Sequence, residues 1–233
     1  MTGLLIYDGK SSKDFGLYIS GSGTFNAPQR DVELVEVPGR NGTLTIDKQR
    51  FQNITIEYPA FIREKFRTHT DAAREWLLAV PGYRRLEDSY HPDEYRMARF
   101  IGPLDFETRV LNRSGECTLS FDCAPQRFLK SGEIPHTLTE AGDFVNPSAF
   151  EAKPFIRVYG TAGSLGVGSV TMEISEIDEY IDIDCDTQNA YKGAVNCNNK
   201  ISSIFPVLSA GKTGITFSGG VTKVVIIPRW WTI

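Results

Sequence analysis

Stretches in which every second residue is apolar, ended by glycine or proline, recur along most of this chain. Clear examples are Ile54–Phe61, Val170–Ile174 and Ile181–Cys185. Such alternation is typical of a β-strand that buries one face and exposes the other. The 21 glycines and 12 prolines among the 233 residues supply the turns between strands. The sequence therefore predicts a mainly β protein.

Before residue 125 the pattern predicts a series of short strands. They are Leu4–Tyr7, Leu17–Ser20, Val32–Val37, Thr43–Ile46, Ile54–Phe61, Tyr95–Ile101, Phe106–Val110 and Cys117–Cys123. The loop Pro38-Gly39-Arg40-Asn41-Gly42 contains Asn-Gly, whose residues both tolerate a positive φ. We expect this loop to be a hairpin tip and a candidate interaction loop. The segment Tyr83–Asp93 is polar instead, and we expect a loop at its end.

One segment departs from the β pattern and predicts a helix over residues 69–80. Ala72, Trp76 and Val80 fall on one helical stripe, and a Pro-Gly pair follows it. Thr68 and Asp71 have the spacing of a capping box at its start. We expect the apolar face of this helix to pack on the sheet.

The alternation of apolar and polar residues fades between Ala124 and Lys153, where prolines and glycines are scattered. Domain boundaries fall in such segments. We therefore divide the chain into an N-terminal β domain of residues 1–130, a linker of residues 131–153 and a C-terminal domain of residues 154–233. The C-terminal part alternates again and predicts a β-sandwich of roughly 85 residues.

The formal net charge of −4 is shared equally between the two halves of the chain. Residues 1–140 hold 18 basic and 20 acidic side chains, and residues 141–233 hold 7 and 9. Proteins that grip nucleic acid carry a basic patch or stripe, so we expect no tight nucleic-acid binding. No stretch has the ~18 apolar residues of a membrane helix, and no signal peptide is visible. We expect no membrane insertion.

The four cysteines are Cys117, Cys123, Cys185 and Cys197, and no pair has the CxxC spacing of a zinc or redox site. Cys117 and Cys123 would face one side of the same strand, ~20 Å apart at ~3.3 Å per residue. That distance is too long for a disulfide. We interpret the cysteines as small core residues in a reducing compartment.

The sequence lacks the motifs of the common enzyme classes. His69, His91 and His136 each stand alone, and no GxSxG, HExxH or P-loop occurs. The glycines of residues 160–168 miss the GxGxxG spacing, and we interpret them as turn glycines. A pair of carboxylates for glycoside hydrolysis is not excluded by the sequence, because the pairing of two carboxylates in space does not show in a sequence.

The acidic stretch Asp182-Ile-Asp184-Cys-Asp186 has the spacing of the first three ligands of a calcium loop. However, Thr187 stands where that loop requires glycine, and Gly193 stands where it requires a bidentate glutamate. The apolar residues between the aspartates predict a strand with its carboxylates on the solvated face, and a weak ion site is the alternative. We expect no metal and no cofactor.

Trp230 and Trp231 are the candidate residues for stacking on a sugar. Adjacent residues of a strand face opposite sides, so we expect one of the two side chains to lie in the core.

Three groups of motifs occur along the chain. The first is Asp14-Phe15-Gly16-Leu17-Tyr18-Ile19, Pro28-x-Arg30 and Val37-Pro38-Gly39-Arg40-x-Gly42. The second is Phe121-Asp122-Cys123-Ala124-Pro125-x-Arg127-Phe128. The third is Asn146, Lys153-Pro154, Phe205-Pro206-x-Leu208-x-x-Gly211 and Ile227-Pro228-Arg229-Trp230-Trp231. In this order, and covering essentially the whole chain, they resemble the distal tail protein of long-tailed, non-contractile bacteriophages that infect Gram-positive bacteria.

The resemblance implies a viral structural protein that is assembled in the host cytoplasm and forms a homohexameric ring at the tail tip or baseplate of the virion. The N-terminal domain, a β-barrel or sandwich with one packed helix, would form the ring, continue the tail tube and let DNA pass. The C-terminal domain would be a galectin-like β-sandwich that points outward. The implied partners are the tail tube protein, the tape measure protein, the tail hub or tail-associated lysin, and the receptor-binding proteins.

Two hypotheses from different classes follow. The first is a structural adaptor, not an enzyme, whose ring joins the tail tube to the host-adhesion device. The alternative is a carbohydrate-binding module built on the C-terminal sandwich, although 233 residues leave no room for the inserted sugar-binding module of some relatives. A hydrolase is the third and weakest hypothesis.

Removal of divalent metal ions should leave the stability of the protein unchanged. The scattered histidines, the unpaired cysteines and the defective calcium pattern supply no complete ligand set. Thermal melts with and without EDTA should therefore overlay. A drop of several degrees in EDTA would reveal a metal site that the sequence does not show.

Overall fold

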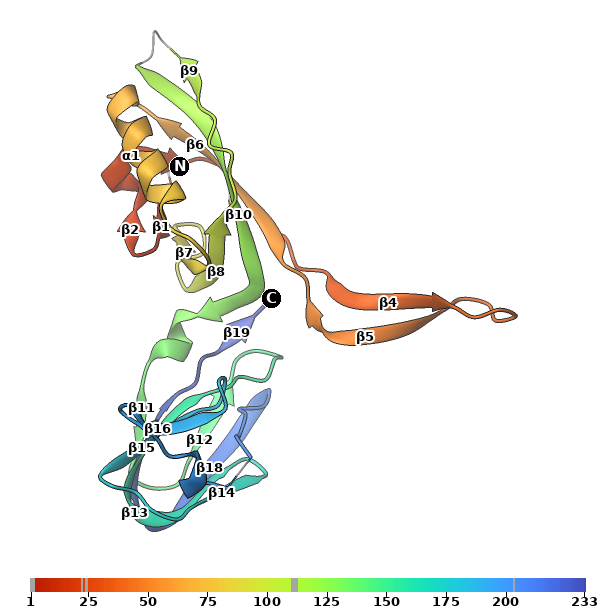
Figure 1. The fold of residues 1–233 in the computed structure, drawn as a ribbon, viewed down its shortest axis with the longest axis vertical. Helices are drawn as coiled ribbons and strands as arrows, with labels where there is room; N and C mark the ends of the chain where they lie inside the picture. The colour runs from red at the N-terminus through yellow and green to blue at the C-terminus, as the bar shows by residue number, and fades with distance from the viewer. Residues whose placement is uncertain (1–2, 22, 24, 110–112, 203) are drawn as a thin grey trace. The chain divides into compact units, whose positions relative to one another are not determined.

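The computed structural model describes residues 3–21, 23, 25–109, 113–202 and 204–233. The chain divides into two compact units, one formed by the residues up to Arg127 together with Ile233 and the other by Phe128–Thr232. Both units are built from antiparallel strands (Figure 1). The predicted mainly β fold with one α-helix is confirmed. Within the described residues, no helix is long and apolar enough to cross a membrane.

Unit 1 contains one curled sheet, one helix and a separate hairpin. Its elements are β1 (Leu5–Tyr7), β2 (Lys10–Ser11), η1 (Ser12–Phe15), β3 (Leu17–Ile19), β4 (Arg30–Glu36), β5 (Thr43–Phe51), β6 (Ile54–Ile62), α1 (Phe66–Leu78), β7 (Arg84–Asp88), β8 (Glu94–Phe100), β9 (Glu107–Arg109) and β10 (Ser114–Leu129). The sheet has the order β2-β1-β7-β8-β10-β6-β3, and β9 pairs with the start of β10. The hairpin of β4 and β5 forms a two-stranded sheet of its own.

The core of unit 1 lies along the paired strands β6 and β10. Their register places Ala60 opposite Cys117 and Tyr58 opposite Leu119, and these alternate side chains are buried. Cys123 lies on the same buried face of β10, and all four cysteines of the chain are buried and free. The alternation of the sequence predicted this arrangement, because a strand in a sheet directs every second side chain to one face.

The helix begins earlier than the sequence predicted, at Phe66 rather than at residue 69. Its N-cap is Lys65, with a φ of 49° and no side-chain hydrogen bond, so the capping box predicted at Thr68 does not form. The cause is Phe66, which is buried and contacts Phe106 edge-on at 5.7 Å. Tertiary packing of this ring extends the helix by one turn and overrides the local capping signal.

The polar segment after the helix contains a strand that the sequence did not reveal. β7 pairs with β1 and with β8, so it lies inside the sheet. Among its five residues only Leu86 is both apolar and buried, while its charged neighbours are half-buried. A strand with one apolar residue gives no alternating signal.

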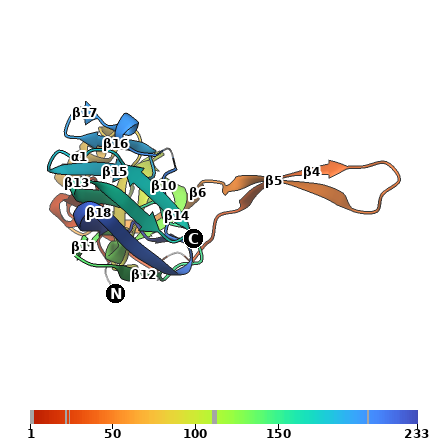
Figure 2. The same cartoon turned by 90° about the horizontal axis from the view of Figure 1, so that it is seen from below.

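Unit 2 is a second antiparallel β structure. Its elements are η2 (Lys130–Glu133), β11 (His136–Leu138), β12 (Gly142–Asn146), β13 (Phe155–Val167), β14 (Val170–Ile174), β15 (Tyr180–Asp184), β16 (Asn189–Lys192), β17 (Val195–Asn196), η3 (Asn198–Lys200), β18 (Gly211–Ile227) and β19 (Trp231–Thr232). The long strands β13 and β18 pair along their length (Figures 1 and 2). One half of this pair continues to β15, and the other half continues to β14. The pair therefore joins β14 and β15 into one sheet whose buried side chains form a single core.

The linker predicted over residues 131–153 is not an irregular connection. It contains η2, β11 and β12, and both strands pair with β18. These strands have three and five residues, too few to show a period. They belong to unit 2, and the division between the two units falls between Arg127 and Phe128.

Three of the glycines interpreted as turn residues lie inside β13. The register between β13 and β18 shifts between Tyr159 and Gly160 and again between Gly160 and Gly163, which interrupts the regular ladder. A Cβ atom at Gly160 would overlap the carbonyl oxygen of Gly220, and one at Gly163 would overlap that of Ser218. These glycines therefore permit close approach of two backbones. Gly168, with a φ of 59°, does lie in a turn.

This close approach predicts that Gly163→Ala destabilises the protein by about 2 kcal/mol or more, because the added methyl group forces the two strands apart. Gly214→Ala in β18 is the matched control. The nearest atom to a Cβ there is Oδ1 of Asp143 at 3.6 Å, an ordinary contact. Thermal melts of both variants test this. Equal melting temperatures for the two variants would contradict the close approach.

Candidate assembly surface

The hairpin of β4 and β5 is the most exposed structure of unit 1, and we call residues 30–51 the arm. Its two strands run side by side in both views (Figures 1 and 2). Near its root, Nε of Arg30 donates a hydrogen bond of 2.9 Å to Asp47, and Nε of Arg50 donates one of 2.7 Å to Asp31. The hydrogen bond from Arg30 lowers the pKa of Asp47. These ion pairs cross-link the strands near the arm's root.

The tip of the arm is the predicted interaction loop of residues 38–42, and all five residues are exposed. The amide of Arg40 donates to the carbonyl oxygen of Val37 at 3.1 Å, which closes a turn over Pro38 and Gly39. Gly39 has a φ of 81°, the conformation that glycine adopts without steric penalty. The turn is therefore made by Pro-Gly rather than by the Asn-Gly pair that the sequence suggested. The role of this loop in an interaction stays a prediction.

Both faces of the arm carry exposed apolar side chains. Side chains of directly paired residues lie on one face, so the pairing of Val35 with Leu44 and of Glu33 with Ile46 places three apolar residues together. Leu44 is 42% exposed and Ile46 is 46% exposed. Leu34, on the opposite face, is 61% exposed. A two-stranded ribbon has no interior of its own and is marginally stable in water. The arm therefore has the character of an uncovered interface.

Unit 1 also has an acidic groove of about 770 Å³, lined by β6, β10 and the segment before β9. It carries the four carboxylates of Glu57, Asp105, Glu107 and Glu116. The sequence did not reveal this groove, because its acidic residues are far apart along the chain. A groove of this charge repels phosphate groups rather than binding them.

The aspartates of the calcium-like stretch are all paired with basic side chains. Asp182 is buried and accepts two hydrogen bonds from Arg157, at 2.6 and 2.8 Å. Asp184 accepts two from Arg229, at 2.7 and 3.1 Å. Asp186 lies 3.2 Å from Nζ of Lys153. The expectation of solvated carboxylates was wrong for Asp182, which the cation beside it allows to be buried. In the part of the chain that the structure describes, no group of three acidic, histidine or cysteine residues could hold a metal ion.

The two tryptophans contribute mainly to packing in unit 2. Trp230 is 5% exposed and belongs to the core. Trp231 is half-buried, stacks on Phe150 at 4.5 Å and donates its indole N–H to the carbonyl oxygen of Glu151 at 2.9 Å. Little open ring surface is left for a sugar. The stacking role proposed for these residues stays a prediction.

No protein-family model matches this chain, and no curated protein matches it. The solved structures do contain similar chains. One is the Dit (gp 19.1) protein of SPP1, described as a paradigm of the hub adsorption apparatus in phages that infect Gram-positive bacteria. It has a TM-score of 0.75 and 14% identity, over 97% of this chain and 98% of that one. This chain has the Dit fold.

A chain of the phage P2 baseplate, in its activated conformation with Ca, is similar at a TM-score of 0.51. Its identity is 10%, and the match covers 97% of both chains. The resemblance to distal tail proteins that the sequence predicted is therefore confirmed at the level of the fold. At these identities the likeness extends to the fold alone.

The paired aspartates predict how stability depends on pH. Burial alone would raise the pKa of Asp184, but the hydrogen bonds from Arg229 and from two backbone amides outweigh it and hold the pKa below its usual value. The depressed pKa adds stability above the unfolded-state pKa of about 3.9, and this stability is lost as the pH falls through the folded-state pKa. Asp184→Asn should therefore cost about 1–2 kcal/mol at pH 7, after screening by solvent.

The difference between wild type and Asp184→Asn should shrink as the pH falls from the unfolded-state pKa of about 3.9 through the lower folded-state pKa, because protonation removes the charge of the wild-type carboxylate. Asp186→Asn is the matched control, because its exposed pair with Lys153 contributes little. Urea unfolding of unit 2 between pH 2 and 7 measures both effects. A difference that stays constant over this range would contradict the proposed pair.

Proposed function

We propose that this protein is a structural subunit of a phage tail tip, in which copies of the chain form a ring. The proposal is supported by the Dit fold over almost the whole chain, since the similar structures are hub and baseplate components. The observation that carries it is the arm, whose apolar side chains are exposed in a single copy. A protein does not keep such a surface uncovered in its working state.

A second copy of the chain is the partner that fits the arm best. In a head-to-tail contact each copy presents one surface and receives another, and such contacts close into a ring when the rotation divides a full turn. Each arm would extend onto the next copy, and the surface of that copy would cover the apolar faces of the arm. The near-balance of charge in residues 1–140 favours such packing, because strong repulsion would oppose copies meeting around one axis. Six copies are the number that the resemblance implies.

The ring would join the tail tube on one side to the host-adhesion device on the other, with unit 2 as a galectin-like sandwich available to the adhesion proteins. DNA would pass through it without being held, because the chain is acidic overall and the groove of unit 1 carries four carboxylates. The proposed role needs no catalysis and no cofactor. The proposed location is the tail tip of the virion, after assembly in the host cytoplasm.

The mass of the particle in solution tests the ring. Six chains of 26.0 kDa amount to about 156 kDa, which light scattering separates from a monomer or a dimer. Leu44→Ser with Ile46→Ser removes two apolar side chains from one face of the arm and should weaken each contact by about 3 kcal/mol. This double variant should shift the mass toward 26.0 kDa at the same protein concentration.

The matched control is Val145→Ser with Val195→Ser, two exposed apolar residues of unit 2 that are 68% and 65% exposed. This control should assemble as the wild type does, and both double variants should keep the wild-type melting behaviour of the monomer. A wild-type protein that stays a monomer or a two-fold dimer at high concentration, with a tail-tube partner present, would refute the ring.

A further inference from the structure

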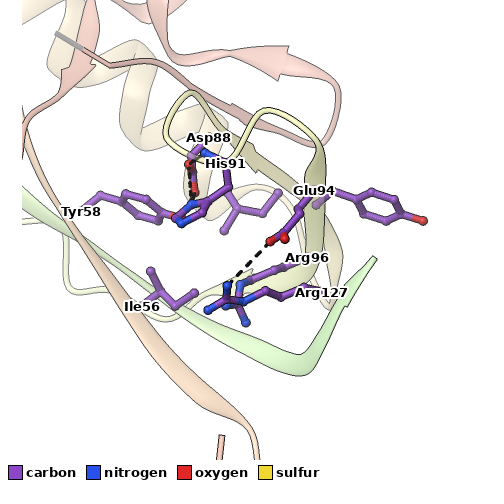
Figure 3. A pocket seen from close by; sticks show the side chains of 9 residues that line it. Ile56, Tyr58, Asp88, His91, Glu94, Arg96 and Arg127 are labelled. Atoms are coloured by element: carbon purple, nitrogen blue, oxygen red, sulfur yellow. Dashed lines mark hydrogen bonds and ion pairs between the residues drawn. The ribbon is translucent and has the colours of Figure 1, made fainter. Parts of the chain in front are cut away.

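A small polar cavity lies inside unit 1, between β6, β8, the end of β7 and the part of β10 that precedes the unit boundary (Figure 3). Its volume is about 20 Å³. Four charged side chains line it, Asp88 from β7, Glu94 and Arg96 from β8 and Arg127 from β10, together with His91 from the turn between β7 and β8. None of these residues belongs to the arm or to the acidic groove.

Arg96 is the unusual residue of this cavity. It is only 9% exposed, and its Nη1 atom is fully buried without a hydrogen-bond partner. Among the described residues its side chain makes no hydrogen bond and no ion pair. Burial, and then the nearby charge of Arg127, lower the pKa of Arg96. A buried guanidinium without a partner is strongly destabilising, and proteins seldom retain one.

Arg127 points into the same cavity and is also incompletely bonded (Figure 3). Its Nη2 donates to the carbonyl oxygen of Asn26 at 2.9 Å, and its Nη1 lies 3.8 Å from Glu94. Its Nε atom is buried without a partner. The cavity therefore receives two unused guanidinium N–H groups, one from each arginine.

The carboxylates of the cavity do not bond directly to Arg96. Asp88 accepts from the hydroxyl of Tyr58 at 2.8 Å and from the backbone amides of Tyr90 and His91, both at 2.9 Å. Nδ1 of His91 is a further contact of Asp88, at 3.1 Å. Glu94 is paired with Arg127 and acts on Arg96 only through its nearby charge. Within the described chain, then, no carboxylate forms a hydrogen bond or ion pair with Arg96.

We propose that this cavity binds one small monovalent anion, of the size of chloride or formate, between Nη1 of Arg96 and Nε of Arg127. The volume supports this size, because a cavity needs roughly 10–15 Å³ to hold one water-sized group. A water molecule would satisfy the hydrogen bonds but would leave the charge of Arg96 without a directly bonded opposite charge. A larger oxyanion would have to widen the cavity.

The site lies where it can connect the sheet of unit 1 to the arm. Arg127 connects the cavity to Asn26, which lies in the segment that leads into β4. The bound anion would hold Arg127 and so join the sheet to the root of the arm. The inference rests on the cavity alone and does not depend on the ring.

An anion exchange at constant ionic strength tests the proposal. Thermal melts are recorded with 100 mM sodium gluconate, which is too large for the cavity, and with the same concentration of sodium chloride or formate. A ligand that binds only the folded state raises the melting temperature, and we expect a rise of about 3 °C for the wild type. Arg96→Met, which replaces the guanidinium by an apolar side chain of similar length, should show no rise.

Arg99→Met is the matched control, since Arg99 lies on the same strand but is exposed and paired with Asp122. This variant should keep the rise of the wild type. Crystals soaked in sodium bromide give an independent readout that does not depend on the folding of any variant. An anomalous peak within hydrogen-bond distance of Arg96 and Arg127 would support the site. An ordered water there, or the same anion response in Arg96→Met as in the wild type, would overturn it.

Discussion

The antiparallel register between β6 and β10 is the interaction on which the rest of unit 1 depends. It places Tyr58 opposite Leu119 and Ile56 opposite Phe121, so the buried faces of two long strands form one core. The same register holds the first residue of β6, which follows β5 after only two residues. The arm is therefore a direct continuation of one of the two long strands of this core. Its root is held by the sheet while its apolar faces stay exposed, and this contrast underlies the proposed assembly.

Much of the fold was predictable wherever one face of a strand is buried and the other is solvated. The alternation gave the position of β6 within one residue, and it gave the position of β14 and the middle of the longer strand β10. It failed for β7, where Leu86 is the only apolar side chain that the sheet buries, and for Gly163, where backbone contact replaces side-chain packing. The start of α1 was missed because a distant ring, Phe106, determines where Phe66 must lie.

Less of the candidate site was predictable. The tip of the arm follows from its turn residues, but the exposure of Leu34 and Ile46 does not, because an alternating strand looks the same whether or not a partner covers it. The pairing of Asp182 with Arg157 and the unpaired state of Arg96 are equally invisible, since both depend on strands that are distant in sequence. The buried and stacked positions of Trp230 and Trp231 likewise follow from contacts in space.

Hydrogen exchange of the arm as a function of protein concentration tests the central claim most directly, because it reports whether a second copy covers these strands. In dilute monomer the amides of residues 30–51 should exchange quickly, since a ribbon without a core opens easily. In the assembled protein the same amides should become protected, while those of β6 and β10 stay protected throughout. An arm that exchanges equally fast in the monomer and in the assembled particle would contradict the account.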